Sequence, residues 1–128
     1  IINLLSNAIK FTPEGGDVGV ELGADAGWAW VEVWDRGCGV AEEDLARLFK
    51  PFEQIQNAGG GKHEGTGLGL TITRALMRAH GGDVEFQSVV GHGTRARLLL
   101  PRDRLVADKF AWSVQSRVEY IDPVDSGF

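Results

Sequence analysis

The 128-residue sequence lacks the features that mark several classes of protein. It contains one cysteine, Cys38, which excludes an internal disulfide framework and fits a reducing compartment. Its 13 basic residues are outnumbered by 18 acidic ones and form no stripe, which argues against a surface that tracks nucleic-acid phosphates. No apolar run approaches the ~18–20 residues that span a bilayer. We therefore expect neither nucleic-acid binding nor membrane contact from this segment.

Glycine, in contrast, is abundant. There are 18 glycines among the 128 residues, about twice the average usage of ~7%. They show no period of three, which excludes collagen, and 43% hydrophobic with 24% charged residues is an ordinary globular composition. One domain is expected at this length. Because the chain opens on Ile1, inside a predicted helix, we expect it to be a fragment of a longer protein.

Hydrophobic periodicity predicts an α/β chain. Apolar residues at helical or alternating spacing predict helices over 1–11, 42–48 and 68–80, and strands over 18–22, 28–35, 83–88 and 94–100. Gly81-Gly82 is expected to supply a left-handed cap for the 68–80 helix. Residues 53–66 have no periodicity and read as a mobile loop. Within 102–128, only 114–121 resembles a strand.

Alternation within 28–35 divides its side chains between two faces of the predicted sheet. One face carries Ala29, Val31, Val33 and Asp35, and the other carries Trp28, Trp30, Glu32 and Trp34. Apolar residues are therefore expected on both faces.

The familiar glycine-rich phosphate motifs do not match. A P-loop fails because Lys62 is followed by His63, and a dinucleotide fingerprint fails because Glu42 stands where its third glycine belongs. The glycines within 65–69 have the wrong spacing for a protein-kinase glycine loop. Glycine abundance alone therefore identifies no phosphate site.

Five sequence boxes occur together instead: NLLSNAIKFT at 3–12, DRGCGV at 35–40, LFKPFEQ at 48–54, GTGLGL at 65–70 and GHGT at 91–94. This ordered set resembles the catalytic ATP-binding domain of sensor histidine kinases, in the wider group that includes gyrase, heat-shock chaperone and mismatch-repair ATPases. The resemblance covers residues 1–101. It implies a Bergerat-type two-layer α/β sandwich, with a mixed, mostly antiparallel sheet backed by helices and a flexible ATP lid.

The resemblance also implies where the domain begins and ends. Its first strand and the start of its first helix are expected to be missing. Residues 102–128 are expected to be a C-terminal tail or linker. The alternative is that Phe110, Trp112 and 114–121 pack on the tryptophan face or on the open edge of the sheet.

The first box carries the expected metal and phosphate contacts. Asn3 and Asn7 are four residues apart and share one helix face, and amide oxygens suit Mg²⁺. The resemblance implies Asn7 as a metal ligand with Asn3 beside it, while a polar helix face or cap is the alternative. Lys10 lies one turn beyond Asn7 and can reach phosphate. Phe11 either contacts the nucleotide or belongs to the core.

The second and fifth boxes carry the expected base contacts. Asp35 ends a strand with its carboxylate pointing inward, which is costly unless a donor is present. The resemblance assigns Asp35 to the adenine amino group; starting a turn is the alternative. Gly37 and Gly39 would let the backbone approach the base closely. Thr94 resembles the family residue that helps hold the base through hydrogen bonds.

The third and fourth boxes frame the expected ATP lid, residues 53–66. Helix N-terminal amides can hold phosphate, and the box that precedes the 68–80 helix contributes Gly65, Thr66, Gly67, Leu68 and Gly69. Lys62 either contacts the γ-phosphate or is a solvated loop charge. Phe49 and Phe52 are expected mainly to pack the base of the lid into the core.

The identity of Asn3 bears on the reaction. Hydrolysing members of the group have a general-base glutamate there, and an amide cannot usefully accept a proton. This favours transfer of the ATP γ-phosphate to a histidine on a separate dimerisation domain, upstream in the parent chain or in trans, with a response regulator downstream. None of His63, His80 and His92 is a good acceptor.

The expected setting is the cytoplasm, with a parent protein that is either soluble or membrane-anchored. Two alternatives remain: an inactive nucleotide-binding or regulatory fragment, and a serine kinase of the anti-sigma-factor type.

Overall fold

The computed structural model describes residues 1–52 and 69–105. Their elements in chain order are α1 (Ile2–Phe11), β1 (Val18–Ala24), β2 (Trp28–Asp35), α2 (Glu42–Leu45), the 3₁₀ helix η1 (Ala46–Phe49), α3 (Gly69–Ala79), β3 (Asp83–Val89), β4 (Gly93–Pro101) and the 3₁₀ helix η2 (Arg102–Arg104). The predicted bounds agree closely, except that the helix expected over 42–48 divides into α2 and η1. The expected lid over 53–66, and the expectations for Phe110, Trp112 and 114–121, fall outside the described residues.

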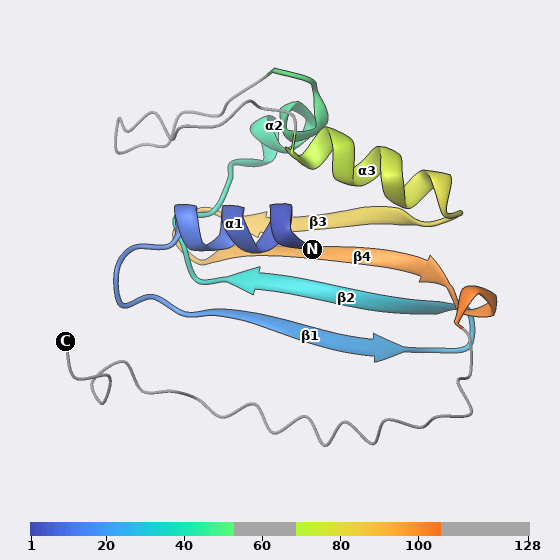
Figure 1. Ribbon diagram of the computed structural model, residues 1–128. Helices are drawn as coiled ribbons and strands as arrows, with labels where there is room; N and C mark the ends of the chain where they lie inside the picture. The colour runs from blue at the N-terminus through green and yellow to red at the C-terminus, as the bar shows by residue number, and fades with distance from the viewer. Residues whose placement is uncertain (53–68, 106–128) are drawn as a thin grey trace.

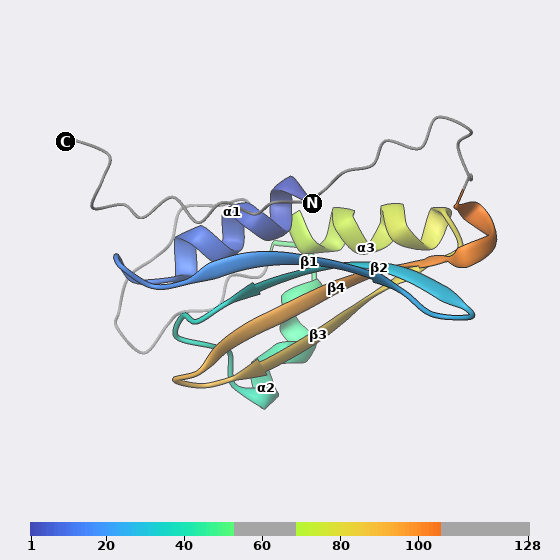
Figure 2. The same ribbon diagram turned by 90° about the horizontal axis from the view of Figure 1, so that it is seen from below.

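The strands form one antiparallel sheet in the order β1-β2-β4-β3 (Figure 1). β2 is central, and its Val33 lies opposite Val20 of β1 and Ala96 of β4. All three pairings of the described residues are antiparallel, so the expected mixed character does not occur within them. Helices α1 and α3 lie on the same side of the sheet (Figure 2). The architecture is the expected two-layer α/β sandwich.

The core lies between these two helices and the sheet. Leu4 and Ala8 of α1 are one turn apart and are both buried, as is Leu70 of α3. From the sheet, Val33 is 2% exposed. Full burial of a Val or Leu side chain contributes about 1.5–3 kcal/mol, so these contacts hold both helices over the centre of the sheet. The remaining buried core residues are Val84, Ala96 and Leu98.

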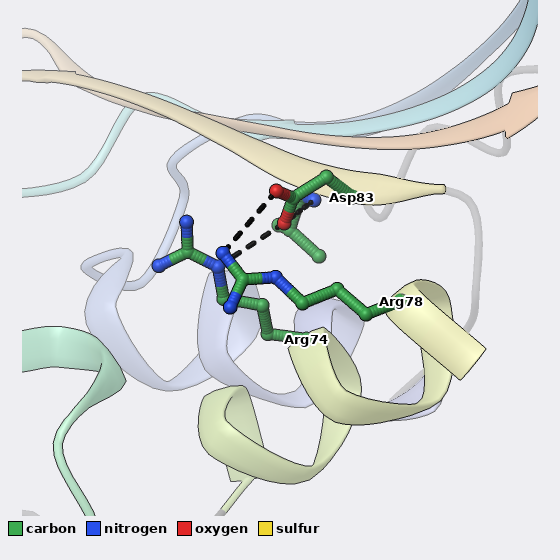
Figure 3. Close-up of polar contacts among 4 residues, drawn as sticks. Arg74, Arg78 and Asp83 are labelled. Carbon is green, nitrogen blue, oxygen red and sulfur yellow. Dashed lines mark hydrogen bonds and ion pairs between the residues drawn. The ribbon is translucent and has the colours of Figure 1, made fainter. Parts of the chain in front are cut away.

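The connection from α3 to β3 fixes the position of the helix. Gly81 has φ +79°, and the N–H of Gly82 donates to the Met77 carbonyl at 2.9 Å, which confirms the predicted left-handed cap. Immediately afterwards, the Asp83 carboxylate accepts hydrogen bonds from Arg74 Nε at 3.1 Å and Arg78 Nη2 at 3.4 Å (Figure 3). This cluster joins the second half of α3 to the start of β3.

The face of the sheet that points away from α1 and α3, here called the outer face, carries three tryptophans from β2: Trp28, Trp30 and Trp34. Glycines of β1 lie opposite two of them: Gly19 faces Trp34 and Gly23 faces Trp30. A Cβ on Gly19 would lie 2.5 Å from the Trp34 ring, and one on Gly23 would lie 2.2 Å from the Trp30 ring. These glycines therefore leave room for the indoles, and the expectation of apolar residues on both faces is confirmed.

A charged cluster, here called the outer-face cluster, is centred on Glu32, between Trp30 and Trp34 of β2. Glu32 is 3% exposed, and its carboxylate pairs with Arg95 and Arg97 of β4. Arg97 donates from Nε at 2.8 Å, and its guanidinium also lies 5.3 Å from the centre of the Trp30 ring. Two cations therefore compensate for the burial of this carboxylate.

Candidate functional site

The candidate site is centred on the end of β2. Asp35, the last residue of that strand, lies directly opposite Thr94 of β4. Its half-buried carboxylate accepts a hydrogen bond from the Gly37 N–H at 2.8 Å and another from the Thr94 N–H. Burial raises the pKa of Asp35 above 3.8, while these two N–H groups oppose that shift. Asp35 is thus an inward-facing hydrogen-bond acceptor, as the strand alternation predicted.

Ser88 of β3, which was not among the predicted site residues, completes this end of the sheet. It lies opposite Thr94 in the β3–β4 register, with the two hydroxyl oxygens 2.8 Å apart. Its Oγ accepts the Val40 N–H at 2.8 Å and donates to the Gly93 carbonyl at 3.1 Å. The alternation signal was present, because Ser88 follows Val84 and Phe86 on the helix-side face at a spacing of two.

Three glycines allow backbone segments to converge around Asp35. A Cβ on Gly37 would lie 2.4 Å from the Phe11 carbonyl oxygen. A Cβ on Gly39, at φ +68°, would lie 2.1 Å from the Val89 carbonyl oxygen, and one on Gly93, at φ +118°, would lie 2.0 Å from that of Asp35. Gly37 and Gly39 were predicted to let the backbone approach the base closely. The structure shows that their missing Cβ atoms make room for neighbouring backbone.

Helix α1 contacts both the Asp35 loop and α3. At its C-terminal end, the Phe11 carbonyl accepts the Cys38 N–H at 3.4 Å. Near its start, the amide nitrogen of Asn3 donates to the Gly69 carbonyl at 3.2 Å and to Thr73 Oγ1 at 3.3 Å. Asn3 therefore fastens α1 to the first turn of α3, a role that its position on the helix face did not reveal.

The other predicted residues of α1 lie between these two contacts. Asn7 is half-buried, one turn beyond Asn3 on the same helix. Lys10 extends its Nζ to 5.8 Å from the centre of the Phe11 ring, and Phe11 itself is half-buried. Asn7 and Lys10 thus lie along α1 between Gly69 and the loop that follows Asp35.

The aromatic box before the expected lid is fastened to α3. Phe49 packs on the core and lies edge-to-face against Phe86, with ring centres 6.0 Å apart. Its carbonyl accepts a hydrogen bond from Thr71 Oγ1 at 3.1 Å, and the Arg74 guanidinium lies 4.7 Å from its ring centre. The predicted core role of Phe49 is confirmed.

Phe52 differs from its prediction. It is 75% exposed, at φ +62°, so the backbone turns its ring away from the core, and its expected packing role is wrong. Five residues of the predicted phosphate site fall outside the described residues: Lys62, Gly65, Thr66, Gly67 and Leu68. Gly69 is described as the first residue of α3.

Two of the three histidines are described, and both contact nearby backbone. His80 Nδ1 is 2.7 Å from the Leu76 carbonyl at the end of α3, and His92 Nδ1 is 3.2 Å from the Val90 carbonyl in the β3–β4 turn. Within residues 1–52 and 69–105, no three His, Cys, Asp or Glu residues gather as metal ligands. Over the same ranges, no helix has the length and apolar character needed to cross a bilayer.

Comparison with known proteins gives consistent matches. Residues 1–104 match the model of the family described as histidine kinase-, DNA gyrase B- and HSP90-like ATPases. The chain is 48% identical over 105 residues to the non-motile and phage-resistance protein of Caulobacter vibrioides, covering 79% of this chain and 12% of that protein. It is 45% identical over 103 residues to histidine protein kinase DivJ of the same organism, covering 79% and 17%. It therefore spans less than a fifth of the length of either relative.

Two solved structures have similar folds. The mycobacterial sensor histidine kinase MprB superposes with a TM-score of 0.69 at 32% identity, over 78% of this chain and 68% of that one. Full-length ShkA, solved in complex with AMPPNP, superposes with a TM-score of 0.67 at 36% identity, over 78% of this chain and 20% of that one.

Proposed function

Because the chain belongs to the family of histidine kinase-, DNA gyrase B- and HSP90-like ATPases, we propose that it binds ATP with Mg²⁺ and presents the γ-phosphate to a histidine on a separate dimerisation domain. The observation that carries this proposal is the half-buried Asp35 carboxylate, which faces the helix layer opposite Thr94. A half-buried carboxylate has lost part of its hydration, so a further hydrogen-bond donor stabilises it. The exocyclic amino group of adenine is such a donor.

The dimensions of α1 support a nucleotide that extends from Asp35 toward α3. The helix contacts the Asp35 loop through Phe11 and the first residue of α3 through Asn3. These contacts are eight residue steps apart along the helix, which at 1.5 Å per step is about 12 Å. In the proposed pose the base lies at Asp35, the phosphates point toward the N–H groups at the start of α3, and Lys10 lies within reach of phosphate oxygens.

Asn7 is the residue that would hold Mg²⁺. Its amide oxygen is a hard ligand, and Mg²⁺ in nucleotide sites is commonly held by few protein groups together with waters and phosphate oxygens. When bound, the ion would neutralise charge on the phosphate oxygens, and Asn7 would orient the triphosphate.

Transfer to a protein acceptor is favoured over hydrolysis by the residue at position 3. The amide nitrogen of Asn3 is engaged with Gly69 and Thr73, and an amide cannot serve as the general base that activates water. The relatives named as histidine kinases support this choice over an anti-sigma-type serine kinase. The dimerisation domain that carries the acceptor histidine, a downstream response regulator and a cytoplasmic location belong to the same proposal.

Phosphotransfer tests the proposal when the parent protein is incubated with γ-labelled ATP and Mg²⁺. The proposal predicts label that is stable to alkali and lost in acid, as expected of a phosphohistidine, and loss of labelling in the Asn7→Ala variant. Labelling that is stable in acid would indicate a serine acceptor. Release of phosphate without labelled protein would indicate a hydrolase. Either result would overturn the proposal.

A further inference from the structure

We propose that Ser88 is a positioning residue that fixes the direction of the Thr94 hydroxyl hydrogen bond and thereby makes the site select adenine over guanine. This inference rests on the ATP site proposed above and adds to it a residue that never touches the nucleotide. Ser88 acts through Thr94, which lies opposite it in the β3–β4 register.

The hydrogen bonds around Ser88 can be assigned by counting protons. A serine hydroxyl has one proton to donate and two lone pairs that accept. The Val40 N–H can only donate to it, and the Gly93 carbonyl can only accept from it. The single Ser88 proton is therefore used by Gly93. The 2.8 Å contact with Thr94 then requires Thr94 to donate its own proton to Ser88.

This assignment determines what Thr94 offers to a ligand. With its proton directed at Ser88, the Thr94 oxygen presents only lone pairs elsewhere. Asp35, directly opposite in the β2–β4 register, is also an acceptor when ionised. The two side chains expected to face the base are thus both acceptors, and this set matches a group that carries two N–H bonds.

Adenine and guanine differ in the exocyclic group that would face Asp35 and Thr94. Adenine has an N6 amino group, which donates, whereas guanine has the O6 carbonyl, which only accepts. A carbonyl oxygen in the same position would face two acceptors with no proton between them, and a site that leaves buried polar groups unpaired rejects such a ligand strongly. If Ser88 did not hold the Thr94 proton, Thr94 could rotate and donate to O6, which would relieve part of this mismatch.

The test compares the dissociation constants of Mg²⁺–ATP and Mg²⁺–GTP by calorimetry. The wild-type chain is compared with Ser88→Ala, the hydroxyl-retaining Ser88→Thr, Thr94→Ala, and Ser88→Ala combined with Thr94→Ala. Ser88→Ala is expected to reduce the preference for ATP over GTP by about tenfold, mainly by strengthening GTP binding. Ser88→Thr should keep the wild-type preference. In the Thr94→Ala background, Ser88→Ala should leave the preference unchanged, because no hydroxyl remains to be oriented.

Three results would overturn the proposal: an unchanged preference in Ser88→Ala, an equal loss of affinity for both nucleotides, or an effect of Ser88→Ala that persists without the Thr94 hydroxyl. If Ser88→Ala does not fold, Ser88→Cys replaces it, because a thiol has similar size but is a weak donor and acceptor. Its expected effect has the same sign. If the wild-type chain binds neither nucleotide, the proposed ATP site fails together with this inference. If it binds ATP and Asp35→Asn weakens that binding while Ser88→Ala changes no preference, this inference alone fails.

Discussion

Asp35 and Thr94 lie directly opposite each other where β2 ends and β4 begins, and the Thr94 backbone N–H donates to the Asp35 carboxylate. The pairing brings together two residues that are 59 positions apart in the sequence (94 minus 35). It also leaves the half-buried carboxylate facing the helix layer, where two N–H groups, but no cation of residues 1–52 and 69–105, act to lower its pKa. A hydrogen-bond donor on a bound ligand would therefore stabilise a carboxylate that no described cation neutralises.

Replacing Asp35 by Asn should weaken ATP binding by about 10- to 100-fold, because hydrogen bonds to charged groups contribute about 1.5–3 kcal/mol. The amide also places a donor where two acceptor oxygens now lie. Calorimetric titration with Mg²⁺–ATP measures the change. Asp103→Asn, which removes an exposed carboxylate in η2, is the matched control and should bind as the wild type does. Equal affinities for Asp35→Asn and the control would contradict the assignment of Asp35.

The raised pKa of Asp35 predicts a pH-dependent stability difference. Burial raises this pKa above 3.8, against the opposing N–H groups, so the native state holds the proton to higher pH than the unfolded chain does. Between 3.8 and the raised value, the contribution of Asp35 to the free energy of unfolding therefore falls as pH rises. Asn does not titrate, so the stability of Asp35→Asn minus that of the wild type should increase across this window. Urea unfolding at a series of pH values tests this, and a flat or decreasing difference would refute it.

The contribution of Asp83 to stability should change with pH in the opposite direction to that of Asp35. Burial acts to raise the pKa of Asp83, but the Val84 N–H and the guanidinium groups of Arg78 and Arg74 outweigh it, so the pKa is lowered. Its contribution to stability is present above 3.8 and is lost as pH falls through the lowered native pKa. Because the cluster is largely exposed, Asp83→Asn should cost about 0.5 kcal/mol at neutral pH and less in 1 M salt.

Urea midpoints at two salt concentrations measure this effect, with Glu85→Gln, an exposed carboxylate on the same strand, as the control. A cost for Asp83→Asn that persists in full at high salt, or at a pH below the native pKa, would show that the ion pairs of Figure 3 are not its source.

Removing the ion pairs of the outer-face cluster should lower stability more than removing those of Asp83, because the side chain of Glu32 is only 4% exposed. Removing both cations with Arg95→Ala and Arg97→Ala leaves a buried carboxylate without partners, which typically costs about 3–5 kcal/mol. Adding Glu32→Leu to this double variant should recover most of the loss, since no buried charge then remains. Chemical unfolding of the three chains measures this. A triple variant no more stable than the double variant would mean that packing of the arginines on Trp30, rather than charge, dominates.

Local patterns were sufficient to predict most of the fold. Strand alternation identified Val33 and Asp35 as inward-facing, and the glycine pair after α3 identified its cap, because both signals depend on near neighbours in the chain. Ser88 was missed because its partners, Val40 and Thr94, come from other elements, and no local pattern indicates which polar groups a register brings together.

Two other differences between prediction and structure also arise from features that local sequence patterns do not encode. The Asn3 amide is used to join α1 to Gly69, a contact that spans 66 residues and leaves no periodic trace. Phe52 was expected to pack inward because it belongs to the aromatic box before the lid, but its positive φ turns the ring into solvent. Side-chain type indicates what a residue prefers, whereas the backbone path decides whether it reaches the core.

The central claim, that the base of ATP binds at the end of β2, is tested most directly by following backbone amide resonances during titration with Mg²⁺–ATP. The account predicts saturable shifts at Gly37 and Thr94, whose N–H groups contact the Asp35 carboxylate, and little change at the Trp30 indole on the outer face. Saturable shifts confined to the outer face, or no shift at Gly37 and Thr94 at saturating nucleotide, would contradict it.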